Sequence, residues 1–205
     1  LIAYRTGDLL ATPRRHLWWL DTTGKPLGNI GEPDDFGPFA LSPDGRNVAV
    51  VLRKFTTKPT SHIGMLDVMR GLRTRFTFAS ENETHPLWSP DGRQLVFESS
   101  RKGHADLYRK SIDGAIGSEE LLLADEHDKR PSSWSRDGKY LLYVQAAANG
   151  KNDVWVMPMT GDRKPFAFAQ TEFSESQPAF SPDGRWVAFV SDESGSADIY
   201  ATPFP

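Results

Sequence analysis

The hexapeptide Trp88-Ser-Pro-Asp-Gly-Arg93 decides the fold of this chain, because close copies of it recur at nearly constant spacing. The other copies are Leu41-Ser-Pro-Asp-Gly-Arg46, Trp134-Ser-Arg-Asp-Gly-Lys139 and Phe180-Ser-Pro-Asp-Gly-Arg185. Their serines are separated by 47, 46 and 46 residues. Proline presets φ, aspartate can accept hydrogen bonds from the backbone ahead of it, and glycine supplies positive φ. Each copy therefore predicts a tight turn between two strands.

Short strand-like runs flank every turn. Runs rich in β-branched and aromatic residues follow the motif at 48–52, 140–144 and 186–190. A polar hairpin, an acidic-apolar-aromatic triplet and a last run, such as residues 73–78, complete each period. Four short antiparallel strands in a period of about 40–50 residues predict the blades of a β-propeller.

The repeat predicts an all-β chain with a single propeller domain over residues 1–205. We expect about five blades: three complete ones at 36–82, 83–128 and 129–174, and two partial ones at 1–35 and 175–205. Two organisations stay open, a five-bladed ring or a fragment of a larger ring. Because the chain opens on Leu1-Ile-Ala-Tyr4 without a Met, we expect a fragment or a processed product. Unpaired edges of the partial blades could drive self-association.

Composition limits the partners and the chemistry. A net charge of −3 gives no basic surface of the kind that nucleic-acid binding requires. The absence of cysteine excludes disulfides, thiolate metal sites and cysteine nucleophiles. No apolar run approaches the roughly 18–20 residues of a membrane span. We therefore expect neither nucleic acid nor a membrane span.

Motifs of catalysis are missing as well. The sequence has no Gly-rich phosphate loop, HExxH, GxSxG or EF-hand pattern, so we predict no catalytic residue, no metal and no cofactor. Aspartates recur once per turn, which favours a structural role over a catalytic or metal-binding one: Asp44, Asp91, Asp137 and Asp183. The triplet aspartates Asp106, Asp153 and Asp198 are expected to bond neighbouring backbone. His104 and the acidic connector 125–128 are interpreted as solvated loops.

A candidate binding surface lies just upstream of the turns. In a propeller the first strand of each blade lines the central channel, so the segments that precede it should ring one channel mouth. Their side chains differ from blade to blade on a constant scaffold, which is where a binding site can be built. The candidate residues for a ligand or partner are Phe36, Glu83, His85, Arg130, Glu175 and Gln177. The alternative is a set of ordinary solvated connectors.

The repeat also carries a family resemblance. Trp88-Ser-Pro-Asp-Gly-Arg93 followed by Asp106-Leu-Tyr108 resembles the WD-like, PD-type repeat of TolB-like propellers, over nearly the whole chain. The stretch 180–205 is similar to the C-terminal propellers of bacterial serine/threonine kinases, and segments 1–7 and 17–21 fit the same group.

This resemblance implies a non-catalytic sensor module that binds a protein or peptide-like ligand outside the cytoplasm of a bacterium. One alternative is the propeller part of a larger enzyme, prolyl-oligopeptidase-like or kinase-linked, whose catalytic domain lies elsewhere. Another is a self-contained propeller lyase or glycosidase. Such an enzyme would need acids and a histidine to converge, and the candidates are Asp34, Asp35, Glu83, His85 and Glu175.

Overall fold

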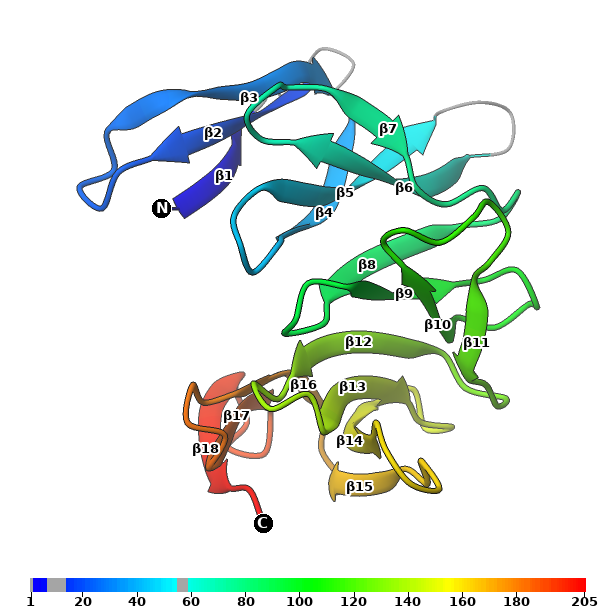
Figure 1. Ribbon diagram of the computed structural model, residues 1–205. Coiled ribbons are helices and arrows are strands. Elements are labelled where there is room, and N and C mark those ends of the chain that lie inside the picture. Colours follow the sequence, from blue (N-terminus) through cyan, green and yellow to red (C-terminus); the bar gives the residue numbers. More distant parts are fainter. Residues whose placement is uncertain (1, 7–13, 55–58) are drawn as a thin grey trace. The chain divides into compact units, whose positions relative to one another are not determined.

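A computed structural model describes residues 2–6, 14–54 and 59–205 as strands joined by turns and loops (Figure 1). None of these residues is helical, so the described part of the chain holds no helix that could cross a membrane. Leu1 and residues 7–13 and 55–58, which fall in the first two expected blades, lie outside the described residues. The all-β prediction is confirmed.

Five antiparallel sheets follow one another along the chain, and we number them in that order. Sheet 1 contains β1 (Ile2–Thr6), β2 (Arg15–Leu20) and β3 (Pro26–Asp34). Sheet 2 contains β4 (Phe36–Leu41), β5 (Asn47–Lys54), β6 (Thr60–Asp67) and β7 (Arg73–Arg75). Sheet 3 contains β8 (Glu83–Trp88), β9 (Gln94–Ser99), β10 (Asp106–Ser111) and β11 (Glu120–Leu123).

Sheet 4 contains β12 (Lys129–Trp134), β13 (Tyr140–Ala146), β14 (Asn152–Pro158) and β15 (Phe166–Ala169). Sheet 5 contains β16 (Glu175–Phe180), β17 (Trp186–Ser191) and β18 (Asp198–Pro203). The described residues thus form three four-stranded blades flanked by two three-stranded ones, as predicted.

The chain divides into two compact units, residues 1–86 and 87–205. The boundary falls within β8. Sheets 1 and 2 belong to the first unit, and sheets 4 and 5 belong to the second. The single-domain organisation stays a prediction.

The motif turns are closed by one serine and one aspartate each. In sheet 3, Asp91 Oδ1 accepts hydrogen bonds from Ser89 Oγ at 2.6 Å and from Arg93 N at 3.0 Å. Gly92 has φ 69°, the left-handed conformation that glycine adopts without strain. The same bonds recur around Asp44, Asp137 and Asp183. The predicted structural role of these aspartates is confirmed.

Apolar cores lie between successive sheets within each unit. In the first unit, sheets 1 and 2 bury a cluster made of Leu17, Ile30, Phe36, Val48, Val50, Leu52 and Leu66. In the second unit, Leu141 of β13 packs toward sheet 3, while its neighbour Leu142 packs with Val187 of sheet 5. Strand alternation thus gives sheet 4 two buried faces. Each fully buried side chain of this size contributes about 1.5–3 kcal/mol.

The fourth strand of sheet 2 is shorter than expected, because β7 ends at Arg75 and does not reach residue 78. Phe76 N and Thr77 N both donate to Ile63 O, at 2.9 and 3.1 Å. Thr77 Oγ1 in turn accepts from Ile63 N at 2.9 Å. A side chain thus replaces the backbone acceptor, and the regular ladder stops.

Candidate binding surface at the leading end of the sheets

The first strands β4, β8, β12 and β16 each run toward a motif turn. We call the opposite end of a sheet, where its first strand begins, the leading end. The second strands finish there, as the pairs Lys129–Gln145 and Glu175–Ser191 show. All six candidate residues stand at the leading ends of sheets 2 to 5.

Three of the six candidates are interior side chains. Phe36 and Glu175 are 1% exposed and Glu83 is 0% exposed. Phe36 belongs to the core of the first unit, where its carbonyl accepts from Arg15 Nη1 at 2.8 Å. Glu175 accepts a hydrogen bond from Thr171 Oγ1. In this conformation these three side chains lie beneath the surface and cannot touch a ligand placed on it.

The other three candidates reach solvent. The Arg130 side chain is 61% exposed, and its Nε lies 3.7 Å from Glu98 Oε2. Gln177 is exposed and His85 is half-buried. These three residues are therefore the ones that can touch a ligand.

Backbone strain marks two of these exposed positions. His85 and Gln177 both have φ 51°, and Arg163 is the only other non-glycine residue with positive φ among those described. Both stand four residues before a motif serine, where the other two complete first strands carry Pro38 and Pro131. Non-glycine residues in such conformations cost on the order of 1–3 kcal/mol and cluster at functional sites.

In the second unit, the first strands of sheets 4 and 5 are hydrogen bonded to each other. Ser132 Oγ of β12 donates to the Pro178 carbonyl of β16 at 2.8 Å, and Phe180 N donates to Ser133 Oγ at 3.1 Å. Arg130 and Gln177 therefore lie on neighbouring first strands.

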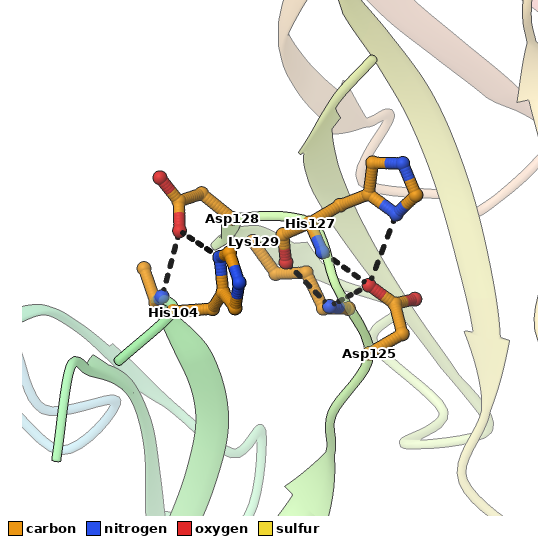
Figure 2. A network of polar contacts seen from close by, with 6 residues as sticks. His104, Asp125, His127, Asp128 and Lys129 are labelled. Atoms are coloured by element: carbon orange, nitrogen blue, oxygen red, sulfur yellow. Dashed lines mark hydrogen bonds and ion pairs between the residues drawn. The ribbon is translucent and has the colours of Figure 1, made fainter. Parts of the chain in front are cut away.

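Lys129, which begins β12, is a feature that the sequence interpretation missed. Its side chain is 0% exposed and its Nζ donates to Asp125 Oδ1 and, at 2.6 Å, to the His127 carbonyl (Figure 2). Asp125 Oδ1 also accepts from His127 N at 2.8 Å. Asp125, Glu126 and Asp128 are exposed, as expected of a solvated loop, but the connector also folds around a buried ammonium group that the sequence did not reveal.

The same connector is tied to the hairpin of sheet 3. Asp128 Oδ1 accepts from Ala105 N at 2.8 Å and lies 3.6 Å from His104 Nδ1 (Figure 2). Lys129 N donates to Ala105 O at 2.7 Å. The connector therefore joins sheets 3 and 4 through both backbone and side chains.

The triplet aspartates do not follow the expectation of backbone bonding. Burial raises the pKa of Asp106, against the opposing effect of the Lys129 charge. Asp153 accepts from the Gln170 side chain at 3.1 Å, and Asp198 accepts from Ser194 Oγ at 2.5 Å. The hydrogen-bond partners of Asp153 and Asp198 are therefore side chains and not main-chain amides.

Acids at the leading ends form no metal-binding cluster among the residues that the structure describes. Asp34 Oδ2 lies 2.6 Å from Arg73 Nη1, and Asp35 Oδ1 lies 3.7 Å from Arg15 Nη1. No three His, Asp or Glu side chains of the described ranges are grouped to hold a metal ion.

The turn end of the second unit is hollowed by two clefts, of about 530 and 450 Å³. Arg136 lines both clefts and has no ion-pair partner among the described residues. It stands where the other motif turns have proline, and that departure from the repeat is the sequence feature that could have revealed it.

Comparison with known proteins identifies the family. A model of the TolB beta propeller domain matches residues 32–164. The chain belongs to this family. Its fold is similar to the crystal structure of TolB from Acinetobacter baumannii, with TM-score 0.77 and 23% identity over 98% of this chain and 49% of that one.

Two curated relatives are enzymes by name. An uncharacterized peptidase, YuxL, of Bacillus subtilis is 27% identical over 78% of this chain and 31% of its own length. Oligogalacturonide lyase of Pectobacterium atrosepticum is 27% identical over 61% of this chain and 38% of its own length. The TolB-like chain thus spans about a third of the length of these relatives.

Proposed function

We propose that this TolB-like propeller is a non-catalytic module that binds a protein or peptide-like ligand at its leading end. The observation that carries the proposal is the strained backbone shared by His85 and Gln177, both at φ 51°. Equivalent positions in two blades thus carry two different polar residues with the same strained φ. Arg130 adds an exposed cation on the strand beside Gln177.

The proposal includes a single propeller domain over residues 1–205. Glu83 and Glu175 are buried and would fix β8 and β16, the strands that carry His85 and Gln177, and Phe36 would fix the start of β4. The ligand would lie across exposed side chains that differ from blade to blade.

Selection of peptides on the intact chain tests this function. Peptides from a random display library are selected on residues 1–205, and their affinities are measured for the chain and for a H85A/R130A/Q177A variant. We expect the variant to lose binding at least tenfold while its melting temperature stays within a few degrees. A R46A/R93A variant at the turn end is the matched control. Equal binding by the triple variant would overturn the proposal.

A second candidate is favoured by the peptidase relative, of which the chain spans 31%. In that case the propeller would control access to a catalytic domain encoded elsewhere in the same gene. Hydrolysis of chromogenic peptide substrates by the full-length product, and not by residues 1–205, would support it. A full-length product without hydrolytic activity would exclude it.

The lyase relative supports a self-contained propeller enzyme less well. Two of the four acids that such an enzyme would need are engaged elsewhere, Asp34 with Arg73 and Glu175 with Thr171. Incubation of residues 1–205 with oligogalacturonides and divalent metal, followed by absorbance of the unsaturated product, tests this reading. Product formation would replace the binding proposal.

We further propose an extracytoplasmic location in a bacterium, which the family resemblance supports. Self-association through the three-stranded sheets 1 and 5 is also proposed, because their outer edges offer unpaired backbone groups. Sedimentation velocity over a concentration series would detect it, and a monomer at all concentrations would exclude it.

A further inference from the structure

A basic cleft of about 240 Å³ lies within the first unit, between the leading ends of sheets 1 and 2. Its lining consists of Asp34, Leu52, Arg53, Lys54, His62, Arg73, Thr74 and Arg75. Four of these side chains are cationic and only one is a carboxylate, although the whole chain has a net charge of −3. The cleft therefore has a local excess of positive charge, whereas the chain as a whole is negative.

Strand register explains how the basic side chains come together. His62 pairs with Leu52, and Arg75 pairs with Gly64, so alternation places His62 and Arg75 on one face of sheet 2. Lys54, two residues beyond Leu52, lies on the same face. Toward the turn end this face is apolar and packs into the core of the first unit. The face changes from apolar to basic at the leading end, where core packing does not require cations.

Only part of this charge is compensated. Arg73 Nη1 lies 2.6 Å from Asp34 Oδ2, which pairs one cation with the one acid. Arg53 and Lys54 have no carboxylate partner among the described residues. Arg75 is held by its Nε, which donates to Thr77 O at 2.7 Å, and by its position 5.0 Å from the Phe78 ring centroid. Its two terminal nitrogens remain as donors.

His62 adds a hydrogen-bonding group without adding charge. It is 9% exposed, and no described residue hydrogen bonds to its imidazole. Burial, reinforced by Arg75, Lys54 and Arg73, lowers its pKa to about 4. The ring is therefore neutral near pH 7, and one of its nitrogens can donate to an oxygen in the cleft.

We propose that this cleft binds a phosphate group, either free or esterified. A phosphate group offers several oxygens and close to two negative charges to Lys54 and Arg75, which share one face of sheet 2, and Arg guanidinium matches this geometry. A carboxylate, with one charge, would leave the cleft strongly positive. This inference does not depend on the proposed peptide binding, because it concerns a different pair of sheets and a different ligand chemistry.

Calorimetric titration of residues 1–205 tests the site with inorganic phosphate, O-phosphoserine and glycerol 3-phosphate, with acetate as the comparison at matched ionic strength. We expect saturable binding of at least one phosphate compound and none of acetate. A preference for inorganic phosphate would identify a free ion, and a preference for either ester would identify an esterified ligand. A K54Q/R75Q variant should bind at least tenfold more weakly, whereas R46Q/R93Q at the turn end should bind normally.

Proton NMR of the His62 ring gives a second readout, with the H62Q variant used for assignment. A bound dianion stabilises the imidazolium form, so phosphate should raise the pKa of His62 and acetate should not. If K54Q/R75Q fails to fold, K54Q alone and this shift in the unaltered chain decide the question. The proposal is overturned if phosphate behaves like acetate, or if a folded K54Q/R75Q variant binds as well as the unaltered chain.

Discussion

Ser89 Oγ donates a 2.6 Å hydrogen bond to Asp91 Oδ1 and accepts one of 3.0 Å from Gln94 N. One hydroxyl thus orients the carboxylate inside the turn and receives the first amide of β9. The hydrogen bond from Ser89 also lowers the pKa of Asp91, with the Arg93 amide acting in the same direction. The serine is 5% exposed, so water cannot easily replace it.

Replacement of Ser89 by alanine should lower the free energy of unfolding by about 1–2 kcal/mol, because Gln94 N loses an acceptor and Asp91 loses a donor. Urea denaturation measures the change. Ser80 is exposed, and S80A should change stability by no more than about 0.5 kcal/mol. Equal stabilities of S89A and S80A would show that the turn does not depend on the hydroxyl.

Replacement of Lys129 by glutamate copies the residue that begins β8 and β16, yet it should destabilise the protein by more than about 3 kcal/mol. The new carboxylate would be buried close to Asp125 and Asp106, with no cation left between them. K129M should cost less, because the half-exposed Asp125 can be hydrated and methionine fills the space. Thermal and urea unfolding of both variants test this order, and a K129E protein more stable than K129M would contradict it.

His62 should make the protein less stable in mild acid. Its pKa is about 4 when folded and 6.5 when unfolded, so the unfolded chain takes up the proton first as pH falls. The stability that comes from keeping His62 neutral in the folded chain is complete above pH 6.5. It is lost progressively as the pH falls from 6.5 to 4. Between neutral pH and pH 5 the loss should be about 2 kcal/mol.

Urea unfolding at pH 7.5 and pH 5 measures this effect. The H62Q variant should lose about 2 kcal/mol less over that interval than the unaltered chain, because its side chain does not titrate. H104Q is the control, since His104 is largely exposed. Parallel pH profiles for H62Q and the unaltered chain would contradict the assignment.

Replacement of Arg136 by proline restores the residue found in the other motif turns. The turn keeps its bonds without the Arg136 amide, since Ser135 Oγ donates to Asp137 at 2.7 Å and Gly138 N donates to Ser135 O at 2.9 Å. R136P should therefore raise stability by about 0.4–1 kcal/mol, through the restricted unfolded chain. A lower melting temperature for R136P than for the matched variant R136A would show that this turn cannot accept proline.

Much of the fold followed from local chemistry in the sequence. The turn around Asp91 needs only neighbouring residues, so its hydrogen bonds could be predicted from Ser-Pro-Asp-Gly alone. The early end of β7 could not, because it depends on Thr77 reaching Ile63 across the sheet. Periodicity indicates where a strand can form, but it does not show when a side chain replaces a backbone acceptor.

The candidate site was predictable in position but not in burial. The sequence placed Glu83 and Glu175 at the start of first strands, yet polar residues there were expected to face solvent. Their depth depends on the connectors that fold over them, as Thr171 does over Glu175. The basic cleft could not be predicted without the pairing register of the strands. Lys54, His62 and Arg75 are separated along the chain and meet only through strand pairing.

The buried start of a first strand also ties its blade to the blade before it, as Lys129 does. The residue that begins each first strand is buried but differs in kind: Phe36, Glu83, Lys129 and Glu175. Lys129 is bonded to the connector and hairpin of the preceding sheet. A blade moved to another position would carry its buried charge away from its partner. The repeats of this propeller are therefore not interchangeable modules, and recombination that shuffled them would yield chains that fold poorly even though every turn was intact.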